Sequence, residues 1–278
     1  GMAYIPAGQF SLGSTQGYRD ELPLSNGQQT SIKAFWIDQT EVTNAQFASF
    51  VKATAYVTDA EKQGGAAVFI APKTGEAIHN NSWWHYVKGA SWQHPAGPQS
   101  NVQGKEHEPV ILLTRNDAEH YAVWLGRDLP TEAQWEYAAK AGSKSDTPLH
   151  QVPQDTHQHP QANYWQGEFP FDNTVEDHFQ SVAPVGCYAS NAFKLFGMIG
   201  NVWEWTSSAY HGAHDQHMGN YAELRQQNST ATQYVLKGGS FLCASNFCAR
   251  YRNSSRYPQE FDLAATHVGF RTILRTVE

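Results

Sequence analysis

The amino-acid sequence predicts one α+β domain that is rich in loops, has little regular secondary structure and spans residues 1–278. Helical periodicity is confined to a few short segments, and glycine, asparagine and aromatic residues interrupt the rest of the chain. No repeat and no linker divides the sequence. Hydrophobic residues make up 40% of the 278 residues and aromatic residues 13%, which is enough to bury a sizeable core.

The N-terminal part predicts short strands followed by a helix. Strands are expected at residues 4–5, 10–12 and 34–38, where apolar side chains alternate or cluster. Thr43 and Gln46 then have the spacing of a capping box, which marks a helix N-terminus. Apolar side chains follow this box at helical spacing, so a helix is expected from Thr43 onward.

Residues 56–109 are polar and aromatic, with Trp83 and Trp84 at their centre. We interpret this segment as long loops held in place by large aromatic side chains. Loops of this length inside a domain are usually functional or disordered, and the tryptophan content argues against disorder.

Two helices are expected next. Thr114 or Asn116 caps the first, which ends at Gly126, and a capping box that begins at Thr131 opens the second, which ends at Gly142. Beyond this point helical periodicity disappears. Only short strands are expected there, at residues 234–236 and 268–273.

Composition excludes several functional classes. The net charge is −7 and no basic run occurs, so nucleic acid is not expected as a partner. No apolar run approaches the roughly 18 residues that a membrane span requires. Lysine and arginine are scarce relative to glutamine, asparagine and histidine, which favours a periplasmic or otherwise exported protein over a cytoplasmic one. We expect a monomer.

The clearest chemical feature is a pair of cysteines, Cys243 and Cys248, five positions apart. On a helix or a strand this spacing would turn the two side chains away from each other. A common target therefore requires a turn between them, for which Ser245 and Asn246 are suited. The spacing alone leaves three alternatives open: a disulfide, a soft-metal site such as one for Cu(I), or two unrelated buried thiols.

Seven segments in order resemble the formylglycine-generating enzyme family, whose members are also called sulfatase-modifying factors. They are Ile5–Phe10, Phe35–Asn44, Leu129–Glu136, Asn163–Gly167, Gly200–Trp205, Lys237–Ser240 and Gly269–Arg271. The resemblance covers nearly the whole chain. It implies a single formylglycine-generating-enzyme domain with a C-type-lectin-like core.

The resemblance also implies an activity: copper- and O₂-dependent oxidation of a cysteine in a sulfatase-type protein or peptide to formylglycine. Cys243 and Cys248 match the two active-site cysteines of the family, which hold the copper ion. Ser240 and Trp203 match positions near that site. Ser240 could donate a hydrogen bond to bound oxygen or serve only in a turn, and Trp203 could be a core residue.

Two departures from the family pattern put the substrate in question. Ala244 and Phe247 stand where characterised members have histidine and tyrosine. The segment 259–262 replaces a substrate-facing Asn-Thr-Pro-Asp sequence, and within it Glu260 could act as a general base if nearby aromatics raise its pKa. The alternatives are an oxidase of the same fold acting on a small-molecule siderophore precursor, as in pyoverdine maturation, or a lectin-like binding module without catalysis.

The resemblance further implies structural calcium. Asn163 and Asp177, with the carbonyl groups of Tyr164 and Phe179, match one family site. A second site is matched more loosely, because its asparagine ligand is Gly197 here; its other residues are Ile199, Gly200, Val202 and Glu204. Oxygen ligands drawn from loops are what Ca²⁺ requires.

The remaining candidates are interpreted as structural. His211, His214 and His217 recur at intervals of three, and His157 and His159 lie two apart, in loop sequence outside the family motifs. We interpret them as solvated histidines rather than as metal ligands. Cys187 is expected to be a small buried hydrophobic residue.

Overall fold

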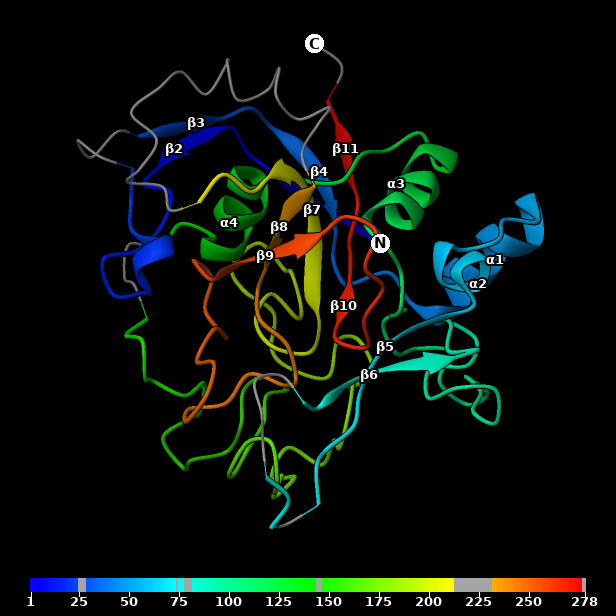
Figure 1. The fold of residues 1–278 in the computed structure, drawn as a ribbon. Coiled ribbons are helices and arrows are strands. Elements are labelled where there is room, and N and C mark those ends of the chain that lie inside the picture. The colour runs from blue at the N-terminus through cyan, green and yellow to red at the C-terminus, as the bar shows by residue number, and fades with distance from the viewer. Residues whose placement is uncertain (25–28, 74, 78–81, 144–146, 213–231, 277–278) are drawn as a thin grey trace.

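A computed structural model describes residues 1–24, 29–73, 75–77, 82–143, 147–212 and 232–276. The first of its sheets joins the two ends of the chain (Figure 1). Strand β4 (Phe35–Asp38) lies at its centre, with β1 (Met2–Ile5) on one side and β11 (Ile273–Arg275) on the other, both antiparallel to it. A small hairpin of β2 (Gly8–Phe10) and β3 (Thr30–Ile32) extends from this region.

The second sheet carries the parts of the chain that surround the candidate site. Its strand order is β10–β7–β8–β9. The strands are β10 (Val268–Gly269), β7 (Trp203–Ala209), β8 (Gln233–Lys237) and β9 (Arg256–Glu260). The run expected at 268–273 is therefore two strands in different sheets, whereas the strands expected at 4–5, 34–38 and 234–236 are confirmed.

The helices begin where the capping residues predicted them. Thr43, Thr114 and Thr131 are the N-caps, and each forms a capping box with the third helical residue. The helices are α1 (Asn44–Thr54), α3 (Arg115–Trp124) and α4 (Glu132–Lys140). Thr114 rather than Asn116 is the cap of α3. No helix in the described ranges has the length and apolar character that crossing a membrane requires.

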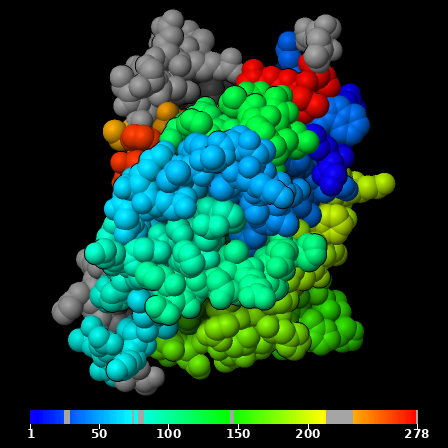
Figure 2. Space-filling model, turned by 90° about the vertical axis from the view of Figure 1, so that its right-hand side faces the viewer, coloured from blue at the N-terminus to red at the C-terminus, as the bar shows by residue number. Residues whose placement is uncertain are grey.

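The interpretation of residues 56–109 as loops throughout was wrong in its first part. This segment contains the helix α2 (Asp59–Gln63) and a hairpin of β5 (Gly65–Phe69) and β6 (Trp84–Lys88). Strand β5 begins Gly-Ala-Ala, residues of low strand propensity, so sequence pattern did not reveal it. In Figure 2 the blue to cyan residues of this part of the chain cover much of one face.

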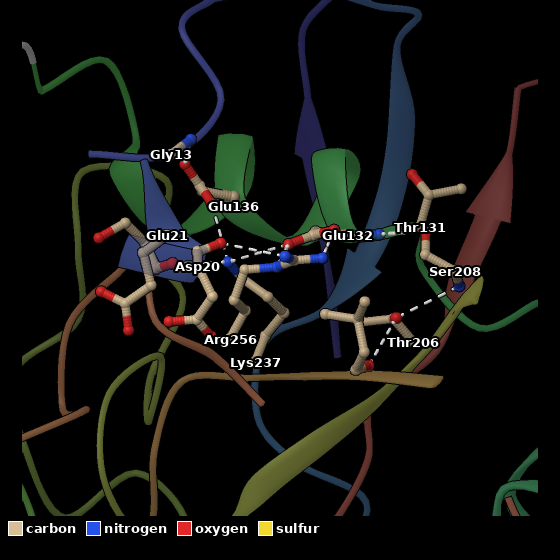
Figure 3. Close-up of polar contacts among 12 residues, drawn as sticks. Gly13, Asp20, Glu21, Thr131, Glu132, Glu136, Thr206, Ser208, Lys237 and Arg256 are labelled. Atoms are coloured by element: carbon tan, nitrogen blue, oxygen red, sulfur yellow. Dashed lines mark hydrogen bonds and ion pairs between the residues drawn. The ribbon is translucent and has the colours of Figure 1, made fainter. Parts of the chain in front are cut away.

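A layer of buried ion pairs connects α4 to the second sheet (Figure 3). Lys237, the last residue of β8, places its Nζ 2.8 Å from Oε2 of Glu136. Arg256, the first residue of β9, places its Nε 2.8 Å from Oε1 of Glu132. All four side chains are nearly inaccessible to solvent. These pairs fix both ends of the loop between β8 and β9, and that loop carries Cys243 and Cys248.

Candidate active site

The two candidate thiols converge. A turn follows Ala244, whose carbonyl accepts hydrogen bonds from the N–H groups of Phe247 (3.3 Å) and Cys248 (3.1 Å). This turn brings the Sγ atoms of Cys243 and Cys248 to 3.9 Å from each other. Both are free thiols; Cys243 is buried and Cys248 is half-buried. The turn predicted at residues 245–246 is confirmed, and it brings the two sulfur atoms together.

The surroundings of the pair shift the pKa values of the two thiols in opposite directions. Burial by itself would raise the pKa of Cys243, but hydrogen bonds from the Cys248 thiol and from the Ser240 N–H (3.4 Å) lower it. The charge of Arg250 acts in the same direction. The pKa of Cys248 is raised, first by the hydrogen bond to Cys243 and then by burial. Within the pair, the thiolate form is therefore favoured at Cys243 and disfavoured at Cys248.

A buried carboxylate from the N-terminal region holds the residues that follow Cys248. Glu21 belongs to the short 3₁₀ helix η1 (Arg19–Glu21), and its Oε1 lies 2.8 Å from Nη1 of Arg250. Its Oε2 lies 2.5 Å from Nη2 of Arg252. The Tyr18 hydroxyl accepts a hydrogen bond from the Ala249 N–H at 3.1 Å. Sequence reasoning missed these residues, because no local pattern links positions 229 apart.

An aromatic surface borders the thiol pair. Phe247, next to Cys248 in the chain, has 51% of its surface exposed. Its ring stacks on Phe169 at a centroid distance of 4.5 Å and meets the edge of Trp83 at 5.3 Å. An exposed aromatic ring supported in this way offers an apolar contact surface beside the sulfur atoms.

The other predicted catalytic residues lie in different environments. Ser240 is fully buried, and its Oγ accepts a hydrogen bond from the Leu242 N–H at 3.3 Å. Trp203 is buried in the core, with its ring 5.8 Å from that of Tyr257. Glu260 is exposed at the end of β9 and accepts a hydrogen bond from Gln233 at 3.0 Å. The structure thus gives Glu260 a solvated position, and its role as a base stays a prediction.

Hydrogen bonds connect three of the four residues predicted for the first calcium site, Tyr164, Asp177 and Phe179, and Asn163 precedes Tyr164 in the chain. Within the described part of the chain, the buried Oδ1 of Asn163 has no hydrogen-bond partner. Asp177 is buried, which raises the pKa of its carboxyl group, and its Oδ1 accepts from the Phe179 N–H at 2.9 Å. The Nε2 of Gln166 donates to both Asp177 and the carbonyl of Tyr164. These two oxygen atoms therefore face one point, which a neutral amide N–H group occupies. Such a set fits a hard cation.

The second predicted calcium set does not fit a cation. Both carboxylate oxygens of Glu204 lie 2.7 Å from nitrogen atoms of Arg271, and one also accepts from the Trp135 indole at 2.7 Å. Gly197 supplies no side-chain ligand, and a Cβ there would lie 2.6 Å from Glu41 Oε2. The carbonyl donors expected from Ile199, Gly200 and Val202 therefore have no free carboxylate beside them.

The histidines and the third cysteine lie apart from the thiol pair in the sequence. His157 and His159 are exposed, and His159 pairs with Asp155. His214 and His217 lie outside the described residues, whereas His211 is described. Among the residues that the structure describes, no group of three or more histidine, cysteine, aspartate or glutamate side chains could hold a metal ion. Cys187 is exposed, so the expectation that it is buried was wrong: it lies in an irregular surface segment rather than in the core.

Solved structures share the fold of this chain. The structure of PvdO from Pseudomonas aeruginosa aligns with a TM-score of 0.66 at 22% identity, covering 99% of this chain and 94% of that one. A Treponema denticola variable protein 1 aligns with a TM-score of 0.62 at 17% identity, covering 99% of this chain and 95% of the other. At these identities the likeness supports the predicted C-type-lectin-like architecture and nothing finer.

Sequence comparison gives the family. A formylglycine-generating enzyme from Mycobacterium tuberculosis is 38% identical, with 97% of this chain and 96% of the relative covered. One from Bos taurus is 37% identical, with 97% and 73% covered. A relative named inactive Cα-formylglycine-generating enzyme 2, also from Bos taurus, is 34% identical over 97% of this chain and 86% of its own.

Overall sequence identity differs little between the relatives named as enzymes and the relative named inactive. Support for activity must therefore come from the geometry of the thiol pair. The kinship with named formylglycine-generating enzymes marks the chain as an oxidoreductase. The model of the sulfatase-modifying factor enzyme 1-like domain matches residues 1–276. The chain belongs to the family of sulfatase-modifying factors.

Proposed function

We propose that the protein is a copper- and O₂-dependent oxidase that converts a cysteine in a sulfatase-type protein or peptide to formylglycine. The observation that carries this proposal is the pair of free thiols, Cys243 and Cys248, whose sulfur atoms lie 3.9 Å apart in a loop anchored at both ends. The relatives named formylglycine-generating enzyme support the same reaction.

The donor set suits Cu(I). Thiolate sulfur is a soft ligand that Cu(I) prefers, and two such ligands suffice for near-linear binding. Zinc would need further ligands, and the described residues provide no third histidine, cysteine or carboxylate for it. Cys243 and Cys248 would hold the ion, which when bound would supply the one-electron chemistry that activation of O₂ requires.

The chain's own residues prepare this site. The Ser240 N–H and the charge of Arg250 favour the thiolate form of Cys243, which is the form that binds a metal ion. Cys248 is half-buried, which leaves one side of the pair open to an incoming substrate thiol. Cys243 itself is buried, whereas the turn residues Ser245, Asn246 and Phe247 are exposed, so the pair is reached from the Cys248 side.

The reaction balances with a thiol reductant as co-reactant. One cysteine side chain and O₂, with two electrons and two protons, give an aldehyde, hydrogen sulfide and water. The carbon–sulfur bond breaks, a carbon–oxygen double bond forms, and O₂ is reduced. Two thiol groups of the reducing agent supply the two electrons and the two protons, and they are oxidised to a disulfide.

The experiment measures oxygen uptake and peptide mass with a Cys-x-Pro-x-Arg peptide, copper and a thiol reductant. We expect uptake with aldehyde formation in wild type and in C187S, which alters an exposed cysteine away from the site. C243S and C248S should abolish both signals. Uptake with a catechol-type substrate alone would instead favour the small-molecule alternative, and binding of a peptide or glycan without uptake would favour the lectin-like module.

We also propose that the first calcium set holds Ca²⁺. The support is the unpaired Oδ1 of Asn163 and the link that Gln166 makes between the Tyr164 carbonyl and the Asp177 carboxylate, in a part of the chain with few ladder hydrogen bonds. A cation there would join the segment at 163–164 to that at 177–179. Since Trp165 donates to the Cys243 carbonyl at 2.9 Å, this segment also supports the cysteine loop.

A further inference from the structure

Two segments that are distant in the sequence hold the two sides of the cysteine turn. On one side, the Trp165 N–H donates to the Cys243 carbonyl at 2.9 Å, and Trp165 forms a parallel β-bridge with Ala244. On the other side, the N–H of Ala249, the residue after the second cysteine, donates to the Tyr18 hydroxyl at 3.1 Å. The backbone of the turn is therefore attached to a different part of the protein at each end.

The tip of the turn is held by Asn246, whose side chain pairs with the backbone of Phe169. Its Oδ1 accepts from the Phe169 N–H and its Nδ2 donates to the Phe169 carbonyl, both at 3.4 Å. One amide thus meets both backbone groups of one residue, which fixes orientation as well as position. The next residue, Phe247, stacks its ring on Phe169 at 4.5 Å and reinforces this contact.

These contacts bear on the distance between the two sulfur atoms. The Sγ atoms of Cys243 and Cys248 lie 3.9 Å apart, and a disulfide would bring them about 1.9 Å closer. Rotation of the buried Cys243 side chain would break the hydrogen bond that its Sγ accepts from the Ser240 N–H. Part of the approach therefore falls to the backbone of the turn, which the contacts of Asn246 and Tyr18 hold in place.

We propose that Asn246 and Tyr18 are positioning residues that hold the two thiols at a separation which disfavours the disulfide and favours binding of one soft metal ion. The part of this inference that concerns the metal rests on the proposed oxidase function, whereas the part that concerns the disulfide does not. Attachment at the tip and at one end restricts the turn more than either contact alone, as supporting contacts around a ligand set generally do.

The first arm of the test measures the reduction potential of the pair in glutathione buffers. All proteins carry C187S, which removes the exposed third thiol. Oxidised glutathione takes up two electrons and the two protons that Cys243 and Cys248 release, and it becomes two molecules of reduced glutathione while an S–S bond forms in the protein. We expect N246A and Y18F each to raise the equilibrium constant for the disulfide about three- to tenfold. A tenfold rise lowers the potential by about 30 mV.

The variants are chosen to disturb little else. Y18F keeps the ring on which the Arg250 guanidinium packs at 4.3 Å and removes only the hydroxyl group.

N101A and Y86F are the matched controls. The Oδ1 of Asn101 accepts from the Gln103 N–H at 3.0 Å, and the Tyr86 hydroxyl donates to the Gln63 carbonyl at 2.9 Å. Both side chains are exposed and far from the turn in the sequence, so their loss should leave the potential unchanged. A potential equal to that of C187S in both N246A and Y18F, or an equal shift in the controls, would overturn the positioning role.

The second arm measures Cu(I) affinity by anaerobic competition with a chelator. N246A and Y18F should bind Cu(I) about three- to tenfold more weakly than their controls, because a loosened pair must be ordered again around the ion. Unchanged affinity in both variants would overturn the part that concerns the metal. If C187S itself binds no Cu(I), that part and the proposed function fail together, while the reduction potentials still decide whether the two residues hold the thiols apart.

Discussion

Replacement of Glu21 by glutamine tests whether the N-terminal region positions the thiols. Glu21 is fully buried, and its two carboxylate oxygens pair with Arg250 and Arg252 at 2.8 and 2.5 Å. Glutamine keeps the size of the side chain and removes its charge. Arg250 retains Asp20, but Arg252, itself 1% exposed, loses its paired carboxylate.

The expected loss of stability is large. Removing one partner of a buried ion pair costs about 3–5 kcal/mol, because the other charge stays buried and uncompensated. D20N is the matched control. Asp20 also pairs with Arg250, at 3.0 Å, but its side chain is 20% exposed. In D20N, Arg250 keeps its pair with Glu21 and no buried arginine loses its only carboxylate, so D20N should cost less than E21Q.

Two assays measure the effects of E21Q and D20N. Urea unfolding gives the free energy of unfolding, and anaerobic competition with a chelator gives the affinity for Cu(I). E21Q should lower both, since Arg250 and Arg252 lie two and four positions after Cys248, whereas D20N should leave the Cu(I) affinity near that of wild type. If E21Q unfolds at the same urea concentration as D20N and binds Cu(I) as tightly, the carboxylate does not position the site.

Three further outcomes are expected. Burial lowers the pKa of His267 to about 3, so below about pH 6.5 the unfolded chain binds a proton that the folded chain does not. Wild type should therefore lose stability as pH falls below about 6.5, and H267Q should lose less. The same loss of unfolding free energy in both proteins, measured by urea unfolding, would contradict this. EDTA should lower Tm in wild type but not in D177N, and an identical response of both proteins to EDTA would exclude calcium at Asp177. At Gly239, φ is +83° and a Cβ would lie 2.4 Å from the Arg250 carbonyl oxygen. G239A should therefore cost about 3 kcal/mol or more of unfolding free energy. A loss below about 1 kcal/mol would show that the loop can move.

Local sequence patterns predicted the helices because capping is a local interaction. Thr43, Thr114 and Thr131 each meet the residue three positions on, so their helices could be located without tertiary information. The turn between the cysteines is local in the same sense. The family motifs extended these local predictions to the fold as a whole.

Features that depend on distant residues were missed or misplaced. Strand β7 is buried on nearly its whole length, so it lacks the alternation by which strands are recognised. Glu21 meets Arg250 across 229 positions, and no single-sequence pattern marks such a pair. Glu204 was predicted as a calcium ligand from its motif, but the partner that occupies it, Arg271, lies 67 positions away. The spacing of Cys243 and Cys248 left their convergence open until the turn at Ala244 was located.

Anaerobic titration with Cu(I) tests the pairing of Cys243 and Cys248 most directly. We predict one tight site per chain in wild type and in C187S, and loss of that site in both C243A and C248A. Tight binding that survives either substitution, or no tight binding in the reduced wild-type protein, would contradict it.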